Sequence, residues 1–215
     1  TVYLRASTSD GLTNNDVDFR ITNLVTETDD TLVVRGTDDA DRFRFVADSV
    51  YRVTINGVDY EFGGQSIARL RFDGQAGPDT AILYGNSDSD SAVLRVGSAD
   101  LSGTGYSISV SDTESIELVG RGGSDLVSIN DSPGDDRFLA SPDHAEMTGE
   151  GFSLVARQFE IVHGYARYGG VDEASLVDSA GDDFFVATPE YGRMTGDGYM
   201  LRAKLFEHVH GYARN

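Results

Sequence analysis

The residues best suited to chemistry are aspartates that recur in two columns along the chain. The first column is Asp30, Asp79, Asp125 and Asp172, and the second is Asp41, Asp90, Asp136 and Asp183. In every copy the two aspartates lie 11 residues apart. Carboxylate oxygens are the ligands that Ca²⁺ prefers, about six to eight to an ion. The columns therefore indicate calcium binding, whereas the alternative is that each Asp only accepts hydrogen bonds from turn N–H groups.

Stacking of the copies would bring the carboxylates of different repeats together. We expect Asp136 and Asp183 to lie near one another, where two negative charges about 4.8 Å apart repel. A calcium ion between them would convert this repulsion into attraction. The candidate metal ligands are Asp41, Asp79, Asp88, Asp90, Asp125, Asp131, Asp135, Asp136, Asp172, Asp178, Asp182 and Asp183.

A second set of reactive side chains comes from the motif "HGYAR", which occurs twice. The candidate ligand ladder is His163, Tyr165, Arg167, His210, Tyr212 and Arg214. His, Tyr and Arg could supply the base, the acid and the carboxylate clamp of a polysaccharide lyase. A catalytic centre is normally single, so a motif that recurs once per repeat favours a stacked ladder or a platform for a sugar ring. We therefore expect a protein that is not an enzyme.

Internal repeats determine which elements position these residues. Residues 131–167 align with 178–214 without a gap, and 22 of the 37 pairs are identical. Each Asp precedes a short strand-like run, and Gly, Asp and Ser fill the turns. Equal repeats stack, so the sequence predicts an all-β, right-handed parallel β-helix or solenoid with 46–49-residue repeats of two rungs each. The alternative is a tandem β-sandwich, although sandwich domains need about 90–100 residues each.

The predicted domain organisation is a single β-solenoid over residues 1–215. Residues 1–27 read as a degenerate N-terminal half repeat, and the repeats span about 28–76, 77–122, 123–169 and 170–215. The chain begins and ends in mid-repeat, which predicts either a segment of a longer array or a subunit that stacks head to tail into a filament.

Composition limits the partners that the chain could have. The 36 Asp and Glu residues against 17 Lys and Arg residues give a net charge of −19, which repels nucleic acid and anionic membranes. No run of 18 apolar residues occurs, so no membrane insertion is expected. The sequence contains no Cys, which excludes disulfides.

The segments "GGSDLVSINDSPGDD" and "GGVDEASLVDSAGDD" carry a family resemblance. They resemble the Asp/Gly-rich, RTX-like repeats of large secreted bacterial surface proteins, which form calcium-filled parallel β-rolls. The spacing of 11 and then about 36 residues is closer to a long-coil variant. The resemblance implies an extracellular or cell-surface protein with a structural or adhesive role. Together with the Asp columns and the mid-repeat ends, it leads us to expect a structural or filament-forming protein that Ca²⁺ rigidifies. The alternative function is a carbohydrate-binding or polysaccharide-lyase-like β-helix.

Overall fold

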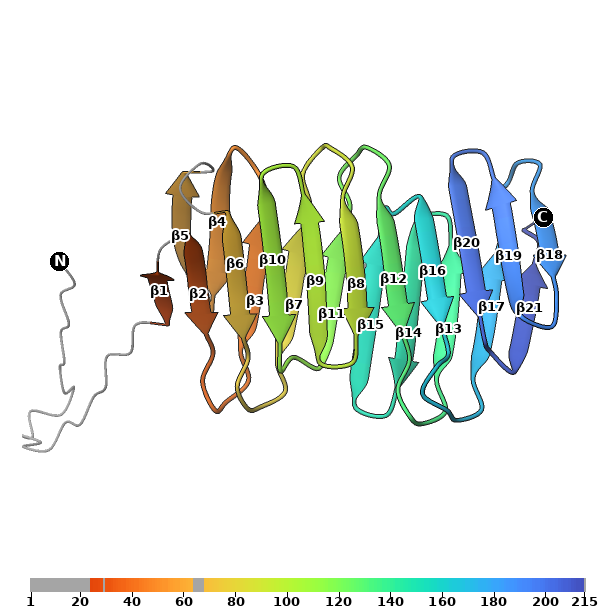
Figure 1. Cartoon of the computed structure of the whole chain (residues 1–215), viewed down its shortest axis with the longest axis horizontal. Helices are drawn as coiled ribbons and strands as arrows, with labels where there is room; N and C mark the ends of the chain where they lie inside the picture. The colour runs from red at the N-terminus through yellow and green to blue at the C-terminus, as the bar shows by residue number, and fades with distance from the viewer. Residues whose placement is uncertain (1–23, 29, 64–67, 215) are drawn as a thin grey trace, which may run out of the picture.

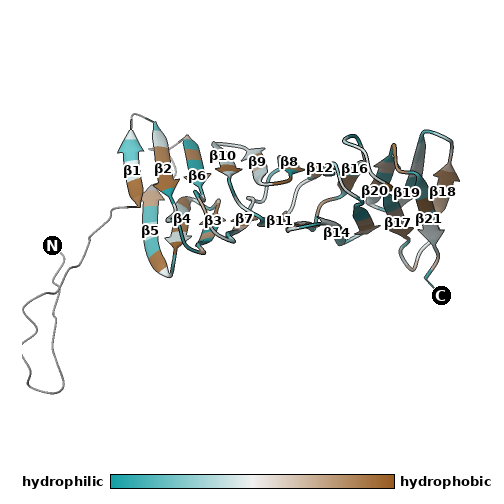
Figure 2. Cartoon of the chain, turned by 90° about the horizontal axis from the view of Figure 1, so that it is seen from below, coloured by the Kyte–Doolittle hydropathy of each residue, from teal (hydrophilic) through white to brown (hydrophobic). Residues whose placement is uncertain are grey.

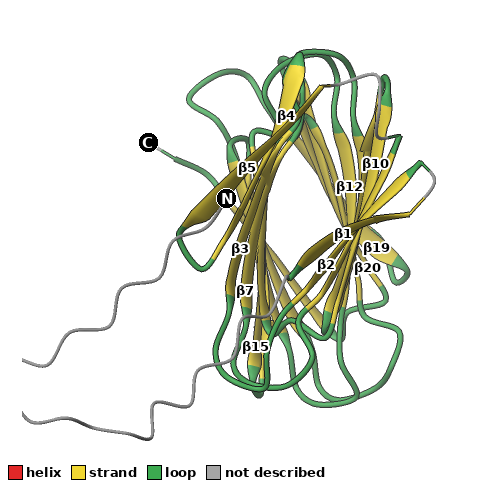
Figure 3. Ribbon diagram, turned by 90° about the vertical axis from the view of Figure 1, so that its left-hand side faces the viewer, coloured by secondary structure: helices red, strands yellow, loops and turns green. Residues whose placement is uncertain are grey.

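All regular elements that the structure describes are β-strands. The computed structural model describes residues 24–28, 30–63 and 68–214, and places 21 strands among them. The strands form two sheets that face one another along the whole length of the molecule (Figures 1 and 3). The all-β solenoid is therefore confirmed, and the two continuous sheets do not divide into tandem sandwiches. Within the described ranges, no helix is present that could cross a membrane.

The first sheet has 11 strands, and it lies in front in Figure 1. Its order is β1 (Val25–Thr28), β2 (Thr31–Arg35), β6 (Arg69–Asp73), β10 (Tyr106–Ser111), β9 (Ser98–Gly103), β8 (Ser91–Arg95), β12 (Leu126–Asn130), β16 (Ile161–Tyr165), β20 (Tyr199–Lys204), β19 (Tyr191–Gly196) and β18 (Phe184–Ala187).

The second sheet has 10 strands. Its order is β21 (His208–Tyr212), β17 (Glu173–Val177), β13 (Arg137–Ser141), β14 (His144–Gly149), β15 (Phe152–Arg157), β11 (Ser115–Val119), β7 (Thr80–Tyr84), β3 (Arg42–Val46), β4 (Val50–Ile55) and β5 (Val58–Gly63).

Each repeat contains five strands, three of which form an antiparallel meander. The meanders β3–β4–β5 and β13–β14–β15 belong to the second sheet, whereas β8–β9–β10 and β18–β19–β20 belong to the first. The other strands pair in parallel with strands one turn away, as β12 does with β16. Because five is an odd number, consecutive copies begin in opposite sheets. This arrangement adds antiparallel hairpins to the parallel stacking that the sequence predicts. The expected two rungs per repeat are wrong, because two consecutive repeats make three turns of the solenoid.

The core lies between the two sheets and follows the period-2 alternation of the strands. In β12, for example, Val127 and Ile129 are buried, while alternate residues face outward. Figure 2 shows the resulting alternation of apolar and polar residues along the strands. Near the C-terminal end, Phe138 stacks on Phe206 with ring centroids 5.7 Å apart. The Phe138 ring also covers Gly164, where a Cβ would approach it to 2.5 Å.

The proposed N-terminal half repeat is only partly described. Residues 1–23 lie outside the described residues, and β1 contains the remainder of that segment. β1 pairs antiparallel with β2. Asp30, the first member of the first Asp column, lies between these strands and is exposed.

Candidate metal centre

The two Asp columns meet across consecutive repeats. The backbone N–H groups of three second-column aspartates each donate a hydrogen bond to the carboxylate of a first-column Asp one turn later. The N···Oδ1 distances are 2.7 Å for Asp41 to Asp79, 2.8 Å for Asp90 to Asp125 and 2.9 Å for Asp136 to Asp172. All six aspartates are at most 3% exposed. Since a buried carboxylate needs hydrogen bonds, these contacts fix one turn to the next.

A glutamate extends each of these contacts into a three-residue ladder. The first-column Asp donates its own N–H to a Glu Oε2 in the following turn. The distances are 2.7 Å for Asp79 to Glu114, 2.7 Å for Asp125 to Glu160 and 2.8 Å for Asp172 to Glu207. Sequence analysis missed these glutamates, although each follows the first-column Asp by 35 residues.

The expected approach of Asp136 to Asp183 is wrong. Asp136 precedes β13 of the second sheet, whereas Asp183 precedes β18 of the first sheet. The chain crosses between the sheets in opposite directions at these two turns, so the aspartates lie at opposite edges of the solenoid. The partner of Asp136 is Asp172 instead.

The second-column carboxylates also close their own turns. Asp136 Oδ2 accepts from the backbone N–H of Ser132 at 2.7 Å, and Asp183 Oδ2 accepts from that of Ser179 at 2.9 Å. The other oxygen packs against a glycine of the following hairpin. A Cβ on Gly149 would lie 1.9 Å from Asp136 Oδ1, and a Cβ on Gly196 would lie 1.9 Å from Asp183 Oδ1. These glycines recur because the carboxylate occupies the space of a side chain.

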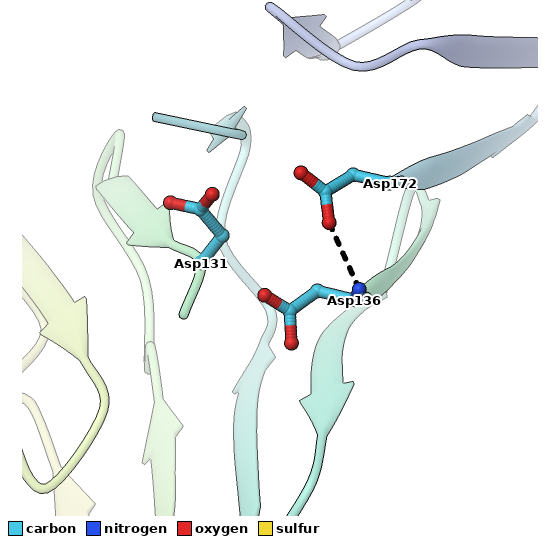
Figure 4. A group of neighbouring side chains, drawn as sticks. All are labelled: Asp131, Asp136 and Asp172. Carbon is cyan, nitrogen blue, oxygen red and sulfur yellow. Dashed lines mark hydrogen bonds between the residues drawn. The ribbon is translucent and has the colours of Figure 1, made fainter. Parts of the chain in front are cut away.

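Three buried aspartates converge at one turn crossing. Asp131 follows β12, Asp136 precedes β13, and Asp172 precedes β17. Each offers a carboxylate oxygen within 4.8 Å of the others (Figure 4). Within the described ranges, this is the one group of three or more acidic or His side chains with metal-ligand spacing. We call it the Asp triad.

Asp131 has an oxygen that the protein leaves unpaired. Its Oδ2 accepts from the backbone N–H groups of Arg167 at 2.7 Å and Tyr168 at 2.9 Å. Its Oδ1 is buried and has no hydrogen-bond partner among the described residues. Because an unpaired buried carboxylate oxygen is costly, this atom is suited to a bound cation.

Burial and mutual repulsion raise the pKa of several ladder aspartates. Burial is the main cause for Asp172, and the nearby carboxylates add to the shift, while the Asp136 N–H opposes it. Burial likewise raises the pKa of Asp125 to about 6, with Asp90 and Glu160 adding repulsion. The ionised carboxylates of the ladders are therefore buried where the protein solvates them poorly.

The remaining predicted ligands lie apart from the Asp triad. Asp88, Asp135 and Asp182 are exposed, and Asp135 accepts a hydrogen bond from the Val171 N–H at 2.8 Å. Asp178 is the counterpart of Asp131 in the next repeat, and it accepts from the Arg214 N–H. The Asp41–Asp79 and Asp90–Asp125 contacts have no third Asp, because Gly36 and Gly85 stand where the third repeat has Asp131.

The two HGYAR motifs lie on the outer faces of different sheets. His163, Tyr165 and Arg167 belong to or follow β16 of the first sheet, while His210, Tyr212 and Arg214 belong to or follow β21 of the second. They therefore form two separate surfaces rather than one ladder. The two arginines make the same backbone contact. The N–H of Arg167 donates a hydrogen bond to Asp131, and the N–H of Arg214 donates one to Asp178.

His163 lies in the more enclosed of these two surfaces. Burial, with help from the neighbouring Arg202, lowers the pKa of His163 to about 4. Its Nδ1 lies 3.3 Å from an Arg202 guanidinium nitrogen, which also donates to the Tyr165 hydroxyl at 2.9 Å. By contrast, His210 is exposed and lies 3.6 Å from Glu173.

Comparisons with known proteins identify no relative. A scan against protein-family models finds no match, and searches of curated proteins and of solved structures find none either.

Proposed function

We propose that this chain is an extracellular structural repeat protein, a β-solenoid rod that a calcium ion stiffens at the Asp triad and that extends by end-to-end stacking. The observation that carries the calcium proposal is Asp131 Oδ1, which is buried, unpaired and beside two further buried carboxylates. Asp131 and Asp136 come from one turn and Asp172 from the next, so a bound ion would join neighbouring repeats.

A hard divalent cation suits this set of donors. Three carboxylates supply oxygen ligands only, which matches Ca²⁺ or Mg²⁺ rather than a thiolate- or imidazole-binding metal. Ca²⁺ tolerates irregular geometry and more ligands than Mg²⁺, and an edge turn built from Ser, Pro and Gly supplies further oxygens without octahedral symmetry. In a repeat protein, stability depends on contacts between neighbours, so an ion at this junction stabilises the whole rod.

Thermal unfolding with calcium and with a chelator tests the calcium proposal. Calcium at 100 times its Kd adds about 2.7 kcal/mol to the free energy of unfolding. For a chain of this size we expect the Tm to rise by about 5–10 °C. The variant Asp131→Asn should lose this rise, while Asp178→Asn, at the matching position of the next repeat, should keep it. An equal Tm with and without calcium, or an equal shift in both variants, would exclude the site.

The C-terminal end of the solenoid supports the end-to-end stacking. β18 and β21 are the outermost strands of their sheets there, so their outer edges have no strand partner among the described residues (Figure 1). Phe184 is 63% exposed and Phe185 38% exposed on β18. In the preceding repeat, Phe138 occupies the position of Phe185 and is fully buried. A further stacked repeat, from a second copy of the chain or from a neighbouring repeat, would cover this edge in the same way.

Light scattering across a concentration series tests this self-association. We expect the mass to rise with concentration and Phe185→Ser to keep the chain monomeric. Leu139→Ser is the matched control, because Leu139 is 39% exposed but lies on the outer face of β13, away from the end. A monomer at every concentration, or equal effects of the two substitutions, would contradict stacking through this end.

A further inference from the structure

The outer face of the first sheet carries an unneutralised cationic cluster. On β16, β20 and β19, outward residues form two rows of three across neighbouring strands. One row is His163, Arg202 and Arg193, and the other is Tyr165, Lys204 and Tyr191. We call these six residues the cationic grid. Arg167 adds a further positive charge, since its guanidinium carbon lies 4.0 Å from the centroid of the Tyr165 ring.

The positive charges of the grid have no acidic partner. Among the described residues, Arg167, Arg193, Arg202 and Lys204 take part in no salt bridge, although the chain has 36 acidic residues. Arg193 and Arg202 are direct cross-strand neighbours. Like charges placed opposite one another destabilise a sheet, so this arrangement costs stability unless an anion offsets it.

Three nitrogens of the grid lack hydrogen-bond acceptors. Arg193 Nε, Arg202 Nε and His163 Nε2 are buried and unpaired among the described residues. The guanidinium of Arg202 can only donate, so His163 Nδ1 accepts from it and the ring proton sits on Nε2. All three unpaired atoms are therefore donors. Buried donors without acceptors are rare, so the chain leaves the positive charge of this cluster poorly compensated.

The preceding repeat shows how the same backbone positions are neutralised within the chain. The matching residues on β11, β15 and β14 are Glu117, Val155 and Glu146 in one row and Val119, Arg157 and His144 in the other. There Arg157 Nε lies 2.7 Å from Glu117 Oε1, and His144 lies 3.6 Å from Glu146. In the cationic grid, His163 takes the position of Glu117 and Arg193 takes that of Glu146. The grid therefore lacks the carboxylates that neutralise the earlier cluster.

We propose that the cationic grid binds an oxyanion, a carboxylate or sulfate group of an external ligand, between the guanidinium groups of Arg193 and Arg202. Guanidinium groups bind such anions through paired, charge-assisted hydrogen bonds. Tyr165 and Tyr191 lie in the neighbouring row, where their rings offer contacts to the carrier of the oxyanion. This inference is independent of calcium binding, since the Asp triad lies in the turns and the grid on a sheet face.

Titration followed by amide NMR tests the proposal with two probes. One is sodium sulfate at constant ionic strength, and the other is tri-galacturonate, with the neutral trisaccharide maltotriose as a negative control. We expect saturable shifts for amides of β16, β19 and β20 with at least one anionic probe and none with maltotriose. Tighter binding of tri-galacturonate would identify an acidic saccharide as the carrier, whereas equal binding would assign a simple oxyanion site.

Matched variants locate the binding on the grid. Arg193→Glu restores the residue of the preceding repeat, so its carboxylate should occupy the site and weaken binding at least about tenfold. Arg69→Glu makes the same charge change on β6 of this sheet, and it should leave the affinity unchanged. Arg193→Gln is the second variant if the glutamate prevents folding. The absence of shifts with both anions, or equal losses in Arg193→Glu and Arg69→Glu, would overturn the proposal.

Discussion

Two carboxylate ladders share one set of hydrogen bonds but differ in their surroundings. The tyrosine ladder consists of Asp90, Asp125 and Glu160, and the triad ladder consists of Asp136, Asp172 and Glu207. Gly85 and Tyr106 border the tyrosine ladder, whereas Asp131 and Phe152 take their places at the triad ladder. One sequence pattern thus accommodates buried charge in two ways.

The tyrosine ladder has the Tyr106 phenol beside its carboxylates. Burial raises the pKa of Asp90, and the neighbouring Tyr106 hydroxyl partly opposes that rise. The triad ladder has no phenol, because Phe152 replaces the tyrosine, and it gains a third carboxylate. The comparison shows that the same backbone N–H contacts join the repeats in both ladders. Our calcium proposal assigns the need for a cation to the two variable positions.

The largest expected effect comes from glycine-to-alanine substitutions, which should destabilise both ladders equally. Gly149→Ala would place a methyl group 1.9 Å from Asp136 Oδ1, and Gly103→Ala would place one 1.9 Å from Asp90 Oδ1. Each should lower the free energy of unfolding by about 2–3 kcal/mol, measured by urea denaturation, because the carboxylate is fixed in the turn. Gly134→Ala is the control, since its methyl group would meet only Ser132 Oγ at 3.7 Å. Similar losses in all three would argue against the close approach.

The next effect tests the tyrosine ladder by pH. The pKa of Asp125 is about 6 in the folded chain against 3.8 for the ordinary group, so folding takes up a proton between these values. Stability from this group therefore falls as pH rises from about 4 to 6, by on the order of 2 kcal/mol. Asp125→Asn should flatten that part of the profile and stabilise the chain at neutral pH.

Denaturant unfolding at several pH values provides the measurement for Asp125. Asp143→Asn, in an exposed turn, is the control that should leave the slope unchanged. A profile in Asp125→Asn that parallels the parent chain would show that Asp125 does not titrate in this range. Asp90 and Glu160 face this carboxylate, and their charges contribute to the same profile.

The smallest expected effect comes from exchanging the aromatic residues beside the two ladders, Tyr106 and Phe152. Tyr106→Phe removes the phenol beside Asp90 and should cost about 1 kcal/mol. Phe152→Tyr adds a donor near Asp136, as Tyr199 donates to Asp183 Oδ1 at 2.8 Å in the fourth repeat. This second substitution should stabilise the calcium-free chain by a similar amount, measured by urea denaturation. If it has no effect with chelator present, the exchange does not explain the difference between the ladders.

Much of the fold follows from the sequence, because turns and periodicity are local features. The 47-residue offset, the Gly and Asp turns and the alternating strands predict an all-β solenoid correctly. A positive φ for the second glycine of each hairpin is also predictable, as at Gly151, with φ of 77°. The first glycine, such as Gly149, has a different reason, the packing of a carboxylate, which needs the three-dimensional structure.

The site was predictable only in part, since its partners depend on how the repeats alternate. Sequence analysis selected Asp131, Asp136 and Asp172 among its candidate ligands. It wrongly predicted that Asp136 lies near Asp183. A pattern of period 47 does not reveal that five strands per repeat move each copy to the opposite sheet. The cationic grid was missed for the same reason, because Arg193 and Arg202 meet His163 only through strand pairing.

The most direct measurement is calorimetric titration of the metal-free chain with Ca²⁺, compared with Asp131→Asn. The account predicts one saturable site per chain in the parent, lost in Asp131→Asn and retained in Asp178→Asn. Heats that fit only weak, non-saturating binding, or one site that survives in Asp131→Asn, would contradict the assignment of the Asp triad as a metal centre.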